Sequence, residues 1–107
     1  MVNRFMRVLV MFDLPTATAE DKRCYTRFRK NLINMGFDML QFSVYSRITR
    51  NYDDAKKYVN KVREFLPPVG SVRVLQVTEK QYAAMIIMLG DKTPTENLLR
   101  TQDLLEL

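Results

Sequence analysis

The stretch MRVLVMFDLP, residues 6–15, runs from apolar side chains into a single acid, Asp13, which Leu14 and Pro15 follow at once. Because a strand does not readily continue through a proline, we expect Asp13 to lie where a strand ends. An unpaired charge is costly to bury, and the neighbours of this carboxylate are apolar. Asp13 is therefore either a turn residue or a group that binds a metal ion or handles protons.

The alternation of side chains predicts a strand from Phe5 to Phe12. Successive residues of a strand point to opposite faces, so every second residue shares a face. One predicted face is wholly apolar, as expected of a core: Met6, Val8, Val10 and Phe12. The other face is mixed and ends at the acid: Phe5, Arg7, Leu9, Met11 and Asp13.

A helix is predicted to begin at Thr18 and to run to about Met35. Thr18 and Asp21 have the spacing of a capping box, in which a hydroxyl and a carboxyl bind free amides at the helix start. Gly36 suits the left-handed residue that ends many helices. The expected buried stripe consists of Cys24, Phe28, Leu32 and Met35.

A second extended region is predicted from Phe37 to Ile48, with a bulge or sharp bend near Leu40, where the alternation changes phase. Beyond the bend the expected core residues are Leu40, Phe42 and Val44. The opposite face, which we expect next to Asp13, then carries Gln41, Ser43, Tyr45 and Arg47. Ser43, Tyr45 and Arg47 are therefore candidates for lining a site at Asp13. The alternative for these three residues is a polar dimer interface.

The second half of the chain predicts a helix capped by Asn51 and ended by Pro67 and Pro68, with Ala55, Val59, Val62 and Leu66 facing inward. A strand from Ser71 to Thr78, a turn or single helical cycle over residues 78–81, and a last apolar strand from Ala84 to Leu89 follow. Residues 91–107 are expected to form a polar tail. Its leucines either pack on a partner or belong to a frayed terminus: Leu98, Leu99, Leu104, Leu105 and Leu107.

This order of elements predicts an α+β, ferredoxin-like βαββαβ domain over residues 1–90, with an added C-terminal strand. Both helices of such a domain cover one face of the antiparallel sheet and leave the other open. The open face would carry Phe5, Leu9 and Met11, which are too apolar to stay in water. We therefore expect a homodimer through that face, in which Asp13 meets its own copy.

Composition narrows the chemistry of the chain. With 107 residues it forms one domain, and 17 Lys and Arg against 12 Asp and Glu leave a net charge of +5, which favours phosphate-bearing partners. The absence of histidine removes the usual imidazole general base, and the single cysteine, Cys24, excludes a disulfide or a thiolate metal site. Without a long apolar run or a signal-peptide pattern, we expect a cytoplasmic protein with no membrane partner.

Three basic residues recur at i, i+4 and i+7 along the first predicted helix: Arg23, Arg27 and Lys30. They lie opposite the predicted buried stripe and form a cationic ridge, which indicates contact with nucleic-acid phosphates or, alternatively, a solvated helix face. The guanidinium of Arg47 also suits a phosphate. The basic residues of the second helix are interleaved with acids and are interpreted as ordinary solvated surface.

Three segments together resemble the CRISPR-associated Cas2 family, with the closest likeness to its type II branch: residues 8–15, 21–30 and 36–47. The resemblance covers residues 4 to about 90. It implies a ferredoxin-like homodimer of the spacer-acquisition machinery of antiviral defence, which binds nucleic acid and bridges dimers of the Cas1 integrase. It also implies a magnesium-dependent endonuclease in which Asp13 is the catalytic metal ligand. Many relatives have Phe-Glu-Gly where this chain has Tyr45-Ser46-Arg47, so no role of that glutamate carries over.

Two facing copies of Asp13 would offer Mg²⁺, or Mn²⁺, the one or two carboxylates that such an ion accepts beside water and phosphate oxygens. The expected nucleic-acid partner is double-stranded DNA, with single-stranded RNA as the alternative. The hypothesis from another class is a structural adaptor, in which Asp13 shapes the dimer and performs no chemistry. A third hypothesis, a regulatory domain for a small ligand, agrees less well with the cationic ridge.

Overall fold

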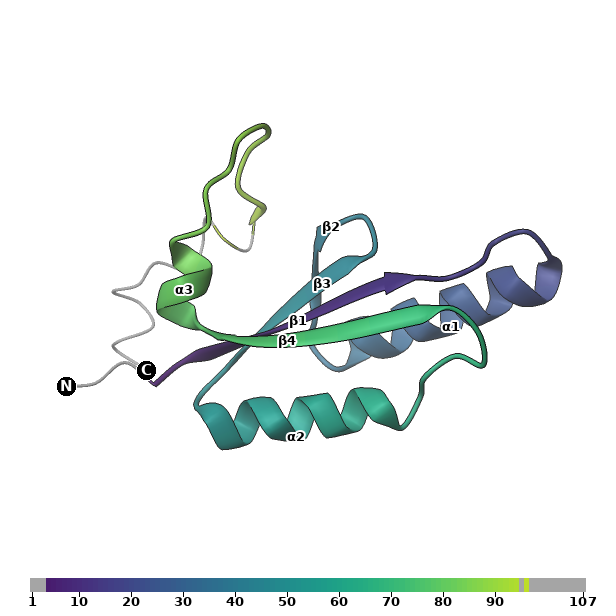
Figure 1. Cartoon of the computed structure of the whole chain (residues 1–107), viewed down its shortest axis with the longest axis horizontal. Helices are drawn as coiled ribbons and strands as arrows, with labels where there is room; N and C mark the ends of the chain where they lie inside the picture. The colour runs from purple at the N-terminus through teal and green to yellow at the C-terminus, as the bar shows by residue number, and fades with distance from the viewer. Residues whose placement is uncertain (1–3, 95, 97–107) are drawn as a thin grey trace.

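The computed structural model describes residues 4–94 and residue 96. Its elements follow the order β1 (Met6–Asp13), α1 (Ala19–Asn34), β2 (Asp38–Gln41), β3 (Val44–Thr49), α2 (Tyr52–Arg63), β4 (Ser71–Thr78) and α3 (Glu79–Ala83). The four strands form one antiparallel sheet in the order β2-β3-β1-β4 (Figure 1). This is the strand order of the split βαβ plan, so the predicted ferredoxin-like class is confirmed.

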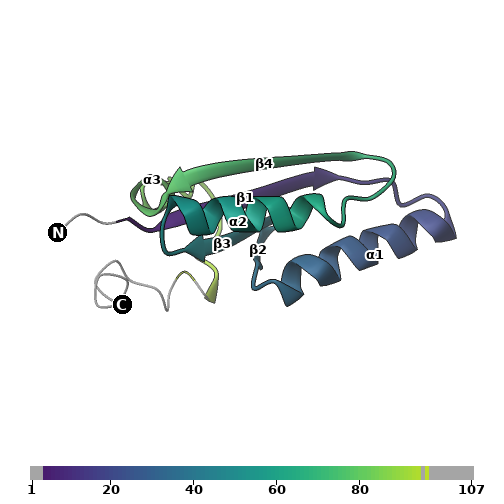
Figure 2. The ribbon, with the colours of Figure 1, turned by 90° about the horizontal axis from the view of Figure 1, so that it is seen from below.

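The core lies between this sheet and one layer of helices. Figure 2 shows β1 passing behind α2, and both helices contribute to one core with β1. The central strand β1 pairs with β3 on one side and with β4 on the other, and Val8 and Val10 are fully buried. The core face predicted for β1 is therefore confirmed, because the side chains that alternate along it point into the helix layer.

The ends of α1 follow from local chemistry. The Thr18 hydroxyl accepts a hydrogen bond from the Asp21 amide at 3.0 Å, and the Asp21 carboxylate accepts one from the Thr18 amide at 3.1 Å. Gly36 follows the helix with a φ of +85°, a conformation that costs a residue with a Cβ atom. Phe28 and Leu32 are buried on the inner face, as predicted, whereas Cys24 and Met35 are only partly covered.

The β2–β3 hairpin corrects one prediction. Its register shifts between Met39 and Gln41, so the bulge expected near Leu40 is confirmed. The faces assigned beyond it are wrong: Tyr45 pairs with Val10 and Arg47 with Val8, so both lie on the helix side of the sheet. The expected core residue Phe42 is 81% exposed, and Val44 pairs with Met11 on the open face.

The reversal has a local cause. Residues 42 and 43 form a tight turn, and Ser43 adopts a φ of +63° there. The turn interrupts the extended backbone that the alternation assumed. Because side chains alternate with a period of two, a slip of one residue moves every later side chain to the other face.

The second half of the domain agrees with the prediction in the start of its helix and in β4, but α2 ends at Arg63 and not at the expected Pro67 and Pro68. Asn51 caps α2 by accepting a hydrogen bond from the Asp54 amide at 2.8 Å, and Ala55 and Val62 are buried. Val59 packs against the core from a partly buried position. Leu66, which was expected to face inward, is 51% exposed because it lies beyond the end of α2.

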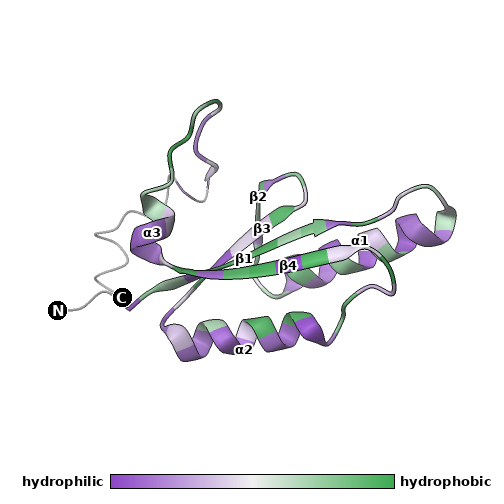
Figure 3. Ribbon diagram, viewed as in Figure 1, coloured by the Kyte–Doolittle hydropathy of each residue, from purple (hydrophilic) through white to green (hydrophobic). Residues whose placement is uncertain are grey.

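The single helical cycle expected over residues 78–81 is α3, capped by Thr78. The predicted strand from Ala84 to Leu89 is wrong, because the described sheet contains only the four strands given above. Instead, residues 85–89 leave α3 as an irregular apolar segment with exposed fractions of 42–96%. Figure 3 shows this hydrophobic stretch standing away from the sheet. The leucines of the predicted tail lie outside the described residues.

Within the part of the chain that the structure describes, no helix is long and apolar enough to cross a membrane.

Candidate nucleic-acid interface and metal ligand

Asp13 is the last residue of β1 and is exposed. It pairs with Ser71 of β4, and the following residue, Leu14, turns back into the core. Over the described residues, the Asp13 carboxylate has no hydrogen-bond or ion-pair partner, so the interpretation as a turn residue held by its own side chain has no support. The strand therefore ends in a free carboxylate that stays open to a ligand.

The backbone around Asp13 is tightly packed even though its side chain is free. Gly70 precedes β4 with a φ of +106°, and a Cβ atom there would lie 2.9 Å from the Asp13 carbonyl oxygen and 2.7 Å from Leu14. On the other side, the Phe12 amide donates to the Ser43 carbonyl at 3.0 Å. These contacts hold the end of β1 between two turns and fix the position from which the carboxylate projects.

Asp13 is isolated from other potential metal ligands within the part of the chain that the structure describes. Among the described residues there is no group of three or more His, Cys, Asp or Glu side chains that could hold an ion. Asp13 supplies a single carboxylate, the kind of oxygen ligand that Mg²⁺ binds once or twice while it keeps several waters. One Asp13 carboxylate therefore fits such an ion, and a second carboxylate would come from another copy of the chain.

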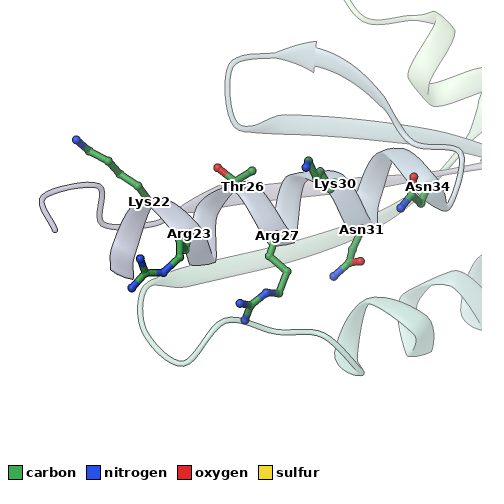
Figure 4. Close-up of a pocket in the computed structure, with 7 residues that line it drawn as sticks. All are labelled: Lys22, Arg23, Thr26, Arg27, Lys30, Asn31 and Asn34. Carbon is green, nitrogen blue, oxygen red and sulfur yellow. The ribbon is translucent and has the colours of Figure 1, made fainter. Parts of the chain in front are cut away.

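The predicted cationic ridge lies on the outer surface of α1. Figure 4 shows the seven side chains that line a shallow hollow of about 540 Å³ on this helix: Lys22, Arg23, Thr26, Arg27, Lys30, Asn31 and Asn34. Arg23, Arg27 and Lys30 share this surface, as their spacing predicted. The structure adds Lys22 and three neutral hydrogen-bonding side chains to it. The i, i+4 spacing of Lys22, Thr26 and Lys30 was the signal that would have identified this second row.

The basic residues of this surface differ in how far they are neutralised. Arg23 forms an exposed ion pair with Glu20 at 2.6 Å, and this hydrogen-bonded guanidinium holds the pKa of the Glu20 carboxyl below its ordinary value. Arg27 and Lys30 have no ion-pair partner in the described part of the chain. They are therefore the residues of the ridge whose charge is most available to an external anion.

Tyr45 and Arg47 do not lie where the sequence placed them. Tyr45 is 1% exposed and stacks on Phe12, and its hydroxyl accepts a hydrogen bond from Arg29 at 2.8 Å. Arg47 reaches between the helices, where it contacts Tyr58 and the Gly36 carbonyl. Of the three candidates for lining the Asp13 site, only Ser43 lies beside the end of β1, through its backbone contact with Phe12.

A basic residue near Asp13 was missed. Met11 pairs with Arg73 and Asp13 with Ser71, so Arg73 is the diagonal neighbour of Asp13 on the open face. Diagonal neighbours in an antiparallel pair lie about 7–8 Å apart, within reach of a long side chain. The alternation of β4 around Leu75 was the signal that would have placed Arg73 on this face.

The open face of the sheet is partly covered by α3. Arg7 and Glu79 form a buried ion pair there, and the Arg7 guanidinium lies 4.3 Å above the Tyr82 ring. Tyr82 donates a 2.6 Å hydrogen bond to Glu96. Beyond α3 the face carries an open apolar patch, in which Leu75 is 49% exposed beside the half-buried Leu9 and Met11.

These features define a class: a ferredoxin-like α+β domain with a basic helix on one side of its sheet and a free carboxylate at the exit of its central strand. The sequence matches the family described as CRISPR associated protein Cas2 over residues 6–85. The chain therefore belongs to the Cas2 family, and the resemblance seen in the sequence is confirmed.

Individual proteins of this family are similar in sequence to the chain. The chain is 53% identical over 85 residues to a CRISPR-associated endoribonuclease Cas2 of Acidovorax ebreus, an alignment that covers 79% of this chain and 83% of the relative. It is 48% identical over 88 residues to the protein of the same name from Campylobacter jejuni, which covers 82% of this chain and 62% of the relative. A solved structure described as the crystal structure of cas2 matches with a TM-score of 0.56 and 14% identity. That match covers 84% of this chain and 92% of the other, and supports the fold alone.

Proposed function

We propose that this protein works as a homodimer in CRISPR adaptation, binds double-stranded DNA through the α1 surface and cleaves phosphodiester bonds at paired copies of Asp13. The free carboxylate at the exit of β1 is the observation that carries the catalytic part of this proposal. The names of the relatives, which call them endoribonucleases, support RNA as the substrate that is cleaved, and we take single-stranded RNA as the form to test.

The apolar open face supports the dimer. On this face Leu75 exposes a hydrophobic side chain that a monomer would leave in water, and so does the segment from Met85 to Leu89, which stands away from the sheet. A two-fold axis through this face brings the same residues of both chains together, so each copy contributes one Asp13 to a shared edge. The dimer would in this way supply the two carboxylates that a Mg²⁺ site accepts.

In that site Asp13 from each chain would hold Mg²⁺ or Mn²⁺. The chemistry that such an ion supplies when bound is an acidified water and compensation of the charge on the phosphate. Arg73, on the same face as Asp13, would hold the non-bridging phosphate oxygens and orient the substrate strand. Ser43 would position the end of β1 through its backbone carbonyl.

The α1 surface supports binding without sequence readout. Its cations and amides suit phosphate and sugar oxygens, and its lining contains no aromatic ring for stacking a base. In this family setting, the bound duplex is the element to which the Cas1 integrase would be added during spacer acquisition. The dimer would then act as the scaffold that holds two integrase dimers around the DNA.

The catalytic proposal is tested with Asp13→Asn, which removes the charge and keeps the shape. Asp38→Asn is the matched control, because Asp38 is an exposed acid at the start of β2. We expect Asp13→Asn to abolish cleavage of single-stranded RNA in Mg²⁺ or Mn²⁺ and to leave duplex binding intact, whereas Asp38→Asn retains both activities. Wild-type protein that cleaves neither RNA nor DNA with either metal would leave only the structural adaptor.

The binding proposal is tested with Arg27→Gln combined with Lys30→Gln. The control pair, Lys56→Gln with Arg63→Gln, removes the same charge from α2. Duplex affinity is measured at several salt concentrations, because each lost phosphate contact lowers the slope of log K against log salt by about 0.9. We expect a lower slope for the α1 pair only; equal slopes for both pairs would contradict binding through α1.

A further inference from the structure

Three cations converge on one tyrosine ring between α2 and the end of α1. The Arg47 guanidinium carbon lies 4.0 Å from the centroid of the Tyr58 ring. The ammonium nitrogens of Lys57 and Lys61 lie 5.0 and 5.1 Å from the same centroid. We call these four residues the Tyr58 cluster. In the sequence these lysines belong to a helix with acids in its first turn, and that mixture concealed their convergence.

The guanidinium of the Tyr58 cluster is held in place by the protein. It donates to the Tyr58 hydroxyl at 2.7 Å and to the Gly36 carbonyl at 3.4 Å, while it stacks on the ring. Its Nε atom is buried, and no acceptor for it is present among the described residues. The central charge of the cluster is therefore preorganised, so little side-chain freedom is lost when an anion binds.

The charge of the cluster is not balanced within the described residues. Among the described residues, Lys57 forms an ion pair with Asp54 at 3.5 Å. Neither Lys61 nor Arg47 has an ion-pair partner there. Cation–π attraction to the Tyr58 ring holds the three cations around it. Like charges held this close repel each other, so an anion that bridges them is bound favourably.

The position of the cluster links it to the α1 surface. Arg47 contacts Gly36, two residues beyond the end of α1, and α1 and α2 contribute to one core with β1. An extended polyanion that follows the α1 surface to its C-terminal end therefore meets the Tyr58 cluster next. A single small anion, in contrast, would contact either the α1 surface or the Tyr58 cluster.

We propose that the Tyr58 cluster is a second phosphate-contact site, which binds the backbone of the same double-stranded DNA that α1 binds. The inference rests on the proposed function. A second site enlarges the protein surface that the DNA contacts, because the duplex then spans the helix layer instead of contacting α1 alone. Lys57 and Lys61 contact the phosphates, and Arg47 and Tyr58 are positioning residues that hold them together.

The test compares three charge-matched pairs in the full chain: Lys57→Gln with Lys61→Gln, Arg27→Gln with Lys30→Gln, and the control Lys56→Gln with Arg63→Gln. The control pair lies on the same helix as the first but outside the cluster. Fluorescence anisotropy with a labelled duplex is recorded over a range of salt. We expect the Lys57/Lys61 pair to lose about tenfold in affinity per phosphate contact near 0.1 M salt and to lower the salt slope by about 0.9 per contact.

Each outcome decides a different claim. If the Lys57/Lys61 pair behaves like the control while the Arg27/Lys30 pair weakens binding, the Tyr58 cluster is not a site and the proposed function stands. If both α2 pairs weaken binding equally, only the general field of the helix acts and the inference is overturned. If wild-type protein shows no salt-dependent binding of the duplex, the proposed function fails and the inference fails with it.

Discussion

Arg7 and Glu79 are 72 residues apart in the chain, yet their side chains meet in a buried ion pair with 2.6 Å between Nε and Oε2. A second hydrogen bond, at 3.1 Å, makes the pair bidentate. Arg7 is 4% exposed and Glu79 6% exposed, so neither charge is solvated. The pair connects α3 to the central strand β1 and covers one end of the open face.

Breaking this pair is expected to destabilise the fold strongly. Glu79→Leu leaves the Arg7 charge buried without its partner, which costs about 3–5 kcal/mol of unfolding free energy. The double variant Arg7→Met with Glu79→Leu removes both charges and is expected to recover most of that loss. Urea unfolding of the two variants and the wild type measures the difference. A double variant as unstable as Glu79→Leu alone would show that packing, not charge, accounts for the loss.

The Tyr82 phenol is expected to titrate far above the ordinary range. Burial raises the pKa of Tyr82 from 10.0 to about 12, and its hydrogen bond to the Glu96 carboxylate adds to the shift. A raised folded-state pKa means that the stabilisation is complete below pH 10 and is lost as the pH rises towards 12. The ultraviolet titration of wild type minus that of Tyr82→Phe isolates this phenol. A midpoint near 10 in the difference curve would contradict the buried position of Tyr82.

A comparison of alanine substitutions at Gly36 and Gly90 distinguishes the cost of backbone strain from the cost of steric crowding. Both have positive φ values, +85° and +98°, which cost a residue with a Cβ atom about 1–2 kcal/mol. A Cβ atom on Gly36 would also collide with the Arg47 guanidinium, whereas Gly90 has open space around it. We therefore expect Gly36→Ala to lower the unfolding free energy by more than Gly90→Ala, by about 1 kcal/mol or more, in urea unfolding. Equal losses would indicate that Arg47 moves aside freely.

Dimerisation through the open face is expected to depend on Leu75. A charge at this half-exposed position has to be desolvated in the interface, so Leu75→Arg is expected to convert a dimer into a monomer. Leu66→Arg is the matched control, because Leu66 has a similar exposed fraction, 51% against 49%, beyond the end of α2. Light scattering during size-exclusion chromatography gives the mass of each. A dimer that survives Leu75→Arg would place the interface elsewhere.

Much of the fold was predictable because its signals are local. The Thr18 capping box, the Asn51 cap and the left-handed Gly36 act within a few residues, so the sequence predicted where α1 begins and ends and where α2 begins. The inward residues of β1 were predictable for the same reason, since its eight residues alternate without interruption. The α1 ridge followed from helical spacing alone.

The faces of the second hairpin were not predictable in this way. The turn at Phe42 and Ser43 sends Tyr45 and Arg47 to the helix side, and only pairing with β1 selects that register. The segment from Met85 to Leu89 has the composition of a strand, but a strand also needs a neighbour with free backbone groups. Neither outcome is encoded within one short stretch.

The sequence by itself determined where α1 begins and ends, where α2 begins, the core side of β1, the position of Asp13 at its end and the basic ridge of α1, because each depends on neighbours along the chain. Only the tertiary structure decided that Arg7 is buried against Glu79, that Tyr45 belongs to the core, and that Arg47 joins Lys57 and Lys61 at the Tyr58 ring. These contacts join residues that the chain separates, and their formation depends on the register and packing of the whole sheet.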